Sequence, residues 1–342
     1  MKYRQPYGIT DENAGYVDGN PALGIEGSAV PFEAVEHPQR EIVNVIERAG
    51  LIPDRNDLTQ LYQALGLLIP QPEKFWLLKR LTASLTINVN AATGNNATAD
   101  GSLQFPFKTI QAACNYVAQN LFLGPYNVTI QVAAGTYAES VSLPQYVRTT
   151  GTIVLSGAGA ATIVNPANVG TWGVALSSAV SYVIKNMQIN VGYTSTVAGY
   201  CSCIYAAGGT ITLDGCTLLV PPGYGGANSA PLVVGGGFVA LGGTGNTITI
   251  TATSAGWGIL VNGGNVSLEA NLAITGAVIS ATISVNYLGS FVRQSALPII
   301  TGSVTGTRYS ATLLGIITVQ GGGANFIPGT LAGGVSTGAQ YA

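Results

Sequence analysis

Acidic side chains that could form a catalytic pair are scarce over residues 81–342 of this 342-residue chain. That stretch contains four of them, Asp100, Glu139, Asp214 and Glu269. Hydrolysis of a glycosidic bond normally needs two carboxyl groups about 5–10 Å apart, one as acid and one as base or nucleophile. Asp214 and Glu269 are the candidates, because they occupy corresponding places two copies apart in an internal repeat. Strand spacing would separate them by about 10 Å, so a pair within one chain is marginal, and a pair between copies of the chain is the alternative.

Other routes to catalysis have less basis in the sequence. A lyase would need clustered Asp residues for calcium and an Arg or Lys base, and the sequence has no such cluster. We interpret the scattered basic residues as solvated or interface charges: Arg148, Lys185, Arg293 and Arg308. The cysteines lack the spacing of a zinc site and are interpreted as reduced core residues: Cys114, Cys201, Cys203 and Cys216. We therefore predict no metal, no cofactor and no catalytic residue, with Asp214 and Glu269 acting only if the chain is an enzyme.

Glycan binding has a clearer basis than catalysis. Aromatic faces and neutral hydrogen-bonding groups are what proteins use to recognise sugars. Five aromatic residues fall at or near expected loops and are the glycan-binding candidates: Trp172, Tyr193, Tyr200, Tyr224 and Trp257. The alternative for each is packing at a corner of the fold or at an interface between copies.

Charge is low and unevenly distributed along the chain. Only 8% of the residues are charged and the formal net charge is −2, which gives no electrostatic reason to expect nucleic acid as a partner. Residues 1–80 hold 11 of the 15 acidic and 8 of the 13 basic side chains, so we expect two regions. The sequence contains no run of 18 apolar residues, so it does not predict a membrane-spanning helix. The first residues lack the apolar core of a secretory signal, so we expect folding in a cytoplasm.

An internal repeat predicts the fold of the longer region. Each copy contains a short apolar-alternating strand, a Gly-rich corner and a second strand, and the copies are residues 204–213, 232–241, 259–268 and 283–292. Their starts are 28, 27 and 24 residues apart. A third alternating stretch often follows, as in residues 247–251, and residues 184–189 align with residues 213–218 as part of an earlier copy. This period is typical of one coil of a parallel β-helix, and a β-sandwich with coincidental spacing is the alternative.

The other segments complete the predicted organisation. It runs as follows: an extended arm over residues 1–31, a helical hairpin over 32–69, a junction over 70–90, the parallel β-helix over 91–310 and a C-terminal cap or tail over 311–342. Apolar residues at helical spacing predict a helix over about residues 109–121, where it could cover the open end of the strand stack.

The hairpin is expected to place Pro38 in the first turn of its first helix and to end that helix at Gly50. Asn56 or Asp57 is expected to cap the second helix. Two short helices have too little core to stand alone, so we expect their apolar faces to pack against other copies.

Three segments resemble known families. Residues 31–65, which include His37-Pro-Gln-Arg-Glu41 and Ala49-Gly-Leu-Ile-Pro-Asp54, are similar to an N-terminal motif of phage and prophage tail fibre proteins. Phe105-Pro-Phe-Lys-Thr-Ile-Gln-Ala-Ala113, followed by Gly135-Thr-Tyr-Ala-Glu-Ser-Val141, resembles the opening of pectate-lyase-like right-handed β-helices. Residues 325–341 resemble the tail end of such fibre proteins. A β-helix opening identifies a fold and not a chemistry.

The resemblance implies a tail fibre or tailspike: a homotrimer in the virion, with its N-terminal module on the phage tail or baseplate and its shaft facing the host. The attachment residues would then be those of the hairpin: His37, Arg40, Ile42, Ile46, Leu58, Leu61 and Tyr62. The expected role is contact with host surface polysaccharide without catalysis. The alternatives are a polysaccharide depolymerase, acting as glycosidase or lyase, and a structural baseplate or collar adaptor that anchors another fibre.

Overall fold

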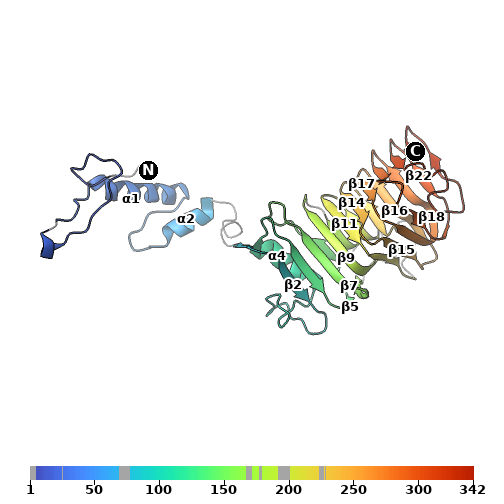
Figure 1. The fold of residues 1–342 in the computed structure, drawn as a ribbon, viewed down its shortest axis with the longest axis horizontal. Coiled ribbons are helices and arrows are strands. Elements are labelled where there is room, and N and C mark those ends of the chain that lie inside the picture. The colour runs from blue at the N-terminus through green and yellow to red at the C-terminus, as the bar shows by residue number, and fades with distance from the viewer. Residues whose placement is uncertain are drawn as a thin grey trace. The chain divides into compact units, whose positions relative to one another are not determined.

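The computed structural model describes residues 5–24, 26–68, 78–166, 172–176, 179–191, 201–222, 227 and 229–342. The chain divides into two compact units, Met1–Leu78 and Lys79–Ala342. Among the described residues of the first unit, the elements are a 3-10 turn η1 (Pro21–Leu23) and two helices, α1 (Phe32–Arg48) and α2 (Gln60–Leu68) (Figure 1).

Helix α1 ends where the sequence predicts and begins earlier than predicted. Gly50 adopts a left-handed backbone (φ 78°). Its N–H donates to the carbonyl of Glu47, and the N–H of Leu51 donates to that of Ile46, which together form a Schellman termination. At the other end the helix starts at Phe32, so Pro38 lies in its interior. The prediction that Pro38 opens the helix was wrong, because extended Pro31 already accepts the first turn's hydrogen bond, from Ala34.

The link between the helices is held by side chains. Asp57 accepts a hydrogen bond from the N–H of Thr59 at 2.8 Å, just before α2. Gln60 accepts from the N–H of Asp54 and donates to the carbonyl of Ile52, both at 2.7 Å. Among the described residues of the two helices, Ile46 and Ala64 are the buried apolar side chains. The two helices therefore share a very small core.

The second unit is a parallel β-solenoid, which confirms the predicted parallel β-helix. Figure 1 shows its strands succeeding one another in sequence order, from green to red. The first ladder contains β2 (Leu85–Val89), β4 (Val128–Val132), the start of β7 (Ile153–Val164), the start of β9 (Ser181–Asn190), β11 (Thr210–Asp214), β14 (Phe238–Gly242), β17 (Asn265–Leu268), β19 (Ser290–Arg293), β23 (Ile316–Thr318) and β25 (Gln340–Tyr341).

Two further ladders complete each coil. The second contains β6 (Val141–Leu143), β8 (Trp172–Leu176), β10 (Ser202–Ala206), β13 (Leu232–Val234), β16 (Ala255–Asn262), the end of β18 (Leu272–Asn286), β22 (Tyr309–Ala311) and β24 (Gly334–Val335). The third contains β5 (Gly135–Tyr137), the ends of β7 and β9, β12 (Thr217–Val220), β15 (Asn246–Ile250), the start of β18 and β20 (Ile300–Thr301). Two short pairings are added, β1 (Lys79–Arg80) with β3 (Leu121–Phe122) and β21 (Val304–Thr305) with β18.

The strand register agrees with the sequence repeat except at one corner. The four predicted starts pair in order: Ile204, Leu232, Ile259 and Ile283. The alignment of residues 184–189 with 213–218 is also confirmed, at Ile184 beside Leu213 and Ile189 beside Leu218. In the fourth copy, however, Leu268 pairs with Arg293 and not with Val292. One extra residue between its two strands shifts the second strand by one place, so the predicted bounds of that copy were wrong.

Apolar side chains fill the interior in columns. One column of the first ladder is fully buried from coil to coil: Val128, Ile153, Tyr182, Ile211, Val239, Val266, Phe291 and Ile317. Each residue packs on its counterparts in the coils above and below. Burial of a Val, Leu or Ile side chain contributes about 1.5–3 kcal/mol. This repeated contribution is the main source of stability in the solenoid.

The adjacent column contains a charge. Leu213, Leu241 and Leu268 are followed in register by Arg293, which is buried. Its guanidinium donates to the carbonyls of Pro298 (2.7 Å), Val319 (3.0 Å) and Ala296, and lies 4.5 Å from the centre of the Phe326 ring. The interpretation of Arg293 as a solvated or interface charge was therefore wrong. Carbonyl dipoles and an aromatic face replace its water.

Helix α4 (Ile110–Asn120) occupies the predicted helical segment and is held at its N-terminus by a distant carboxylate. The helix contacts β2, β3, β4 and β6. Glu139 accepts hydrogen bonds from the N–H groups of Ile110 at 2.8 Å and Gln111 at 2.9 Å, and Thr109 caps the N–H of Ala112. Burial raises the pKa of Glu139, against the lowering effect of these backbone donors. A negative group at this position also favours the helix dipole.

Glu139→Ala should therefore loosen α4. We expect the free energy of unfolding in urea to fall by about 1–3 kcal/mol, because two buried backbone donors lose a charged acceptor. Amide hydrogen exchange at Ile110 and Gln111 should accelerate with it. Glu269→Ala is the matched control, because that carboxylate is exposed, and it should change stability little. Equal effects of the two substitutions would contradict the clamp.

Candidate functional site

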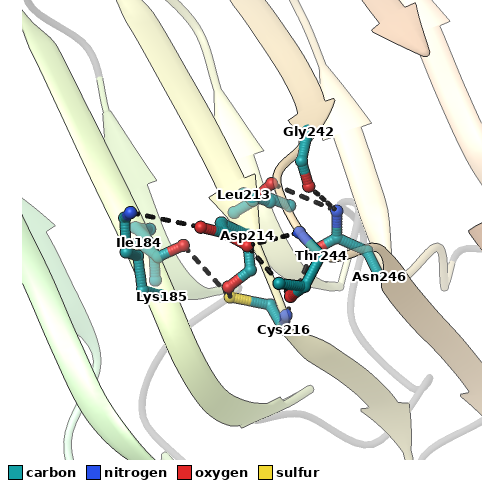
Figure 2. A network of polar contacts seen from close by, with 8 residues as sticks. All are labelled: Ile184, Lys185, Leu213, Asp214, Cys216, Gly242, Thr244 and Asn246. Carbon is teal, nitrogen blue, oxygen red and sulfur yellow. Dashed lines mark hydrogen bonds and ion pairs between the residues drawn. The ribbon is translucent and has the colours of Figure 1, made fainter. Parts of the chain in front are cut away.

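Asp214 lies at the centre of a polar network that joins three successive coils (Figure 2). It ends β11, in register with Lys185 of the preceding coil and Gly242 of the following one. Its Oδ2 lies 3.1 Å from the ammonium of Lys185. Its Oδ1 accepts hydrogen bonds from the N–H of Thr244 at 2.7 Å and from the hydroxyl of Thr244 at 3.1 Å. The carboxylate therefore connects its own coil to the coil before it and to the coil after it.

The turn after β14 is shaped around this carboxylate. Gly243 has a φ of 68°, and a Cβ there would collide with Asp214. Buried Asn246 continues the network: its amide donates to the carbonyls of Leu213 (3.1 Å) and Gly242 (3.3 Å) and accepts from the N–H of Cys216 (3.0 Å). These bonds satisfy backbone groups that the corner would otherwise leave unpaired.

The Cys216 thiol completes the network as a donor. It donates to the carbonyl of Ile184 at 3.2 Å. Burial raises its pKa to about 11, which keeps the sulfur protonated at neutral pH and unreactive as a nucleophile. The prediction that the cysteines are reduced core residues agrees with their burial and free state.

The electrostatics of Asp214 do not suit a general acid. Partial burial acts to raise its pKa, but the hydrogen bonds from Thr244 and the ammonium of Lys185 outweigh this effect, so the pKa lies below its usual range. The group is therefore held as an anion at neutral pH. A glycosidase acid needs the opposite, a carboxyl whose pKa is raised.

Glu269 shares a column with Asp214 but not its partners. Leu268 pairs with Leu241, so Glu269 lies next to Gly242. Gly242 is also the partner of Asp214, so one coil separates Asp214 from Glu269. Its side chain is exposed and accepts a hydrogen bond from the hydroxyl of Ser267 at 3.0 Å. The other two acidic residues are also engaged: Glu139 holds α4, and exposed Asp100 accepts from the N–H of Ser102.

Trp257 is the predicted glycan-binding residue whose side chain the structure describes. Tyr193, Tyr200 and Tyr224 lie outside the described residues, as does the side chain of Trp172 at the start of β8. Trp257 lies in β16 and not in a loop. With Tyr205 of β10 it packs on a second, separate apolar cluster formed by Ala230, Val233 and Leu260.

This aromatic patch, Tyr205 and Trp257 over the second cluster, lies on the second ladder outside the main core. Tyr205, Val233 and Leu260 are in register. Tyr205 was not among the glycan-binding residues predicted from the sequence. The available signal was the second position of the first three repeat copies, which is apolar or aromatic where an outward side chain is expected. Both aromatic rings are partly exposed. The patch therefore places two aromatic side chains at the surface of the second ladder.

The hairpin residues divide into a groove and a separate exposed set. Ile42, Ile46, Leu58 and Leu61 line an open groove of about 560 Å³ between α1 and α2. Leu58 is 94% exposed. His37 and Tyr62 are exposed outside the residues that line it, and Arg40 pairs with Glu36 at 2.6 Å. The α1 side of the groove is apolar, whereas the link and the start of α2 also contribute polar and charged side chains: Asp54, Arg55, Asp57 and Gln60.

The described residues show neither a metal-binding cluster nor a membrane-spanning helix. No three His, Cys, Asp or Glu side chains in this part of the chain gather where they could hold a metal ion. Among the described helices, none has the length and apolar character needed to cross a membrane. Comparisons with protein-family models, curated proteins and solved structures found no match for the chain.

The Asp214 network should make stability depend on acid pH. Because the folded-state pKa of Asp214 is lowered, its contribution is present above the unfolded-state pKa of about 3.9 and is lost as pH falls through the folded-state value. We expect Asp214→Asn to lower the free energy of unfolding by about 1 kcal/mol at pH 7 and to flatten its decline below pH 4. Lys185→Met should weaken the same pH dependence. An unchanged profile in both variants would show that the ion pair is not coupled to folding.

Proposed function

We propose that the chain is a tail fibre or tailspike of a phage or prophage-derived particle. Its N-terminal unit attaches to the tail or baseplate, and its solenoid contacts host surface glycan without cleaving it. The proposal includes a homotrimer and a right-handed, pectate-lyase-like coil. The observation that carries it is the combination of a low-charge parallel solenoid with a helical unit whose described large apolar side chains are mostly exposed.

The groove between α1 and α2 supports the attachment role. Its apolar lining stays open in the single chain, with Ile42, Leu58 and Leu61 all exposed. Exposed apolar grooves of this kind mark protein–protein contacts. An amphipathic segment of a tail protein, or the same helices of another copy, would bury it.

The geometry of the solenoid supports binding over cleavage. Asp214 is fixed as an anion by Lys185 and Thr244, and its pKa is lowered where the acid of a glycosidase needs a raised one. The aromatic patch provides two rings beside an apolar floor, the surface that sugar rings stack on. Repetition in a trimer would strengthen individually weak sites through avidity.

Retention on host polysaccharide tests the glycan role. We expect the purified chain to be retained on the immobilised polysaccharide and to release neither reducing nor unsaturated ends. Trp257→Ala should reduce retention about tenfold, since stacking on an aromatic ring contributes about 1 kcal/mol or more. The double variant Asp214→Asn, Glu269→Gln is the control and should be retained as the unsubstituted chain is. Release of fragments would establish a depolymerase, and absence of retention would favour the structural adaptor.

Incorporation into particles tests the attachment role. Leu58→Gln together with Leu61→Gln removes apolar surface from the groove, and we expect the chain to be lost from tail particles purified from the producing strain, as measured by immunoblot. Leu103→Gln is the control, because Leu103 is also an exposed apolar residue and belongs to the other unit. Normal incorporation of the double variant would exclude the groove as the docking site.

A further inference from the structure

One corner of the solenoid changes its length partway along the chain. It connects the second ladder to the first, and in the coils that run from Ala206, Val234 and Val261 it contains four residues before the next inward side chain. In the coils that run from Val285, Ala311 and Val335 it contains five, the same number as between Leu176 and Tyr182 ahead of the shorter corners. The extra residue is therefore inserted at the same place in three successive coils.

The two kinds of corner differ in composition and backbone strain. The shorter corners are Gly-rich, as in Gly235-Gly236-Gly237. The longer ones place Tyr287-Leu288, Leu313-Leu314 and Thr337 in the left-handed region, with φ from 51° to 64°. Five of the seven non-glycine residues with positive φ in the described chain lie here. Bulky side chains are strained in this conformation, and such strain points to a function.

These side chains form an exposed apolar ridge. This apolar ridge comprises Tyr287, Leu288, Leu313, Leu314 and Thr337. The side chains of these residues line one open concavity of about 460 Å³. Leu288 is 72% exposed and Leu314 is 53% exposed. Backbone hydrogen bonds from Leu288 to Leu313 and from Leu314 to Thr337 hold the three corners in line along the stack.

The surroundings of the ridge are also apolar and almost uncharged. Among the described residues 106–278 no large apolar side chain is exposed. Between residues 279 and 335, ten large apolar side chains are exposed. Residues 270–342 contain no acidic residue and no lysine, and the two arginines are Arg293, which is buried, and Arg308. A surface without like charges can meet an identical surface without electrostatic repulsion.

We propose that the apolar ridge is the contact between copies of this chain along the C-terminal coils. Its knobs repeat at the strand spacing of a parallel stack, about 4.8 Å. A second stack in parallel alignment presents the same ridge at the same period, so the side chains of two copies can interdigitate over all three coils. This inference rests on the proposed homotrimer only for the number of copies. It adds where the copies meet and which residues meet there.

Thiol cross-linking of the full chain tests this contact. Thr337→Cys places a reactive thiol on the ridge, and a short bismaleimide should convert the monomer band to cross-linked dimer. The native cysteines are buried, and burial raises their pKa, so the unsubstituted chain should stay unlinked. Leu103→Cys, on an exposed residue far from the ridge in sequence, is the positional control and should also stay unlinked.

A disruptive variant separates the contact from folding. Leu288→Asn with Leu314→Asn introduces residues that adopt the left-handed backbone more readily than leucine. The temperature of thermal unfolding should therefore be unchanged or shifted upward. In that background the Thr337→Cys cross-link should be lost. Light scattering of the unsubstituted chain should give about three times 34.9 kDa. A monomer would overturn both the trimer and this inference. A trimer in which Thr337→Cys links no better than Leu103→Cys would overturn the inference alone.

Discussion

The whole solenoid depends on one constraint, the register between parallel strands of successive coils. Each backbone group in a ladder has its partner in the coil above or below, so the coils must keep their strands aligned on all three ladders at once. Inward columns such as Val239, Val266 and Phe291 follow from that alignment. Corners can vary in length only where the added residue projects outward, and the longer corners at Tyr287-Leu288 and Leu313-Leu314 meet this condition.

Fixed polar contacts let the structure tolerate buried and half-buried charge. Asp214 has Lys185 and Thr244, Glu139 has the first N–H groups of α4, and Arg293 has three carbonyls and the Phe326 ring. In each case at least one partner belongs to another coil or to a covering element. A charged group used in this way specifies how neighbouring segments align. The need for such fixed partners explains both why charges are scarce in the solenoid and why the charges that remain have a structural role.

Much of the solenoid could be predicted because its repeat appears directly in the sequence. The starts at Ile204, Leu232, Ile259 and Ile283 pair as their alignment predicts. The errors have local causes. The inserted corner residue shifted Arg293 into the core column, where a single sequence gives no sign that carbonyl groups converge on it. Tyr205 was overlooked because outward strand positions were expected to be polar. The Asp214–Glu269 column was predictable from the repeat, but the engagement of Asp214 by Lys185 depends on contacts across coils.

The coil register also governs how such a chain can change over evolutionary time. Ile211 pairs with Val239, 28 residues later, and Val239 with Val266, 27 residues later. Recombination that removes or duplicates one such unit joins strands that already match, so the fold survives and the reach of the protein changes by one strand spacing, about 4.8 Å. Insertions of other lengths survive only when they fall at corners. Length is therefore the property of this protein that can vary most freely while its surface chemistry is retained.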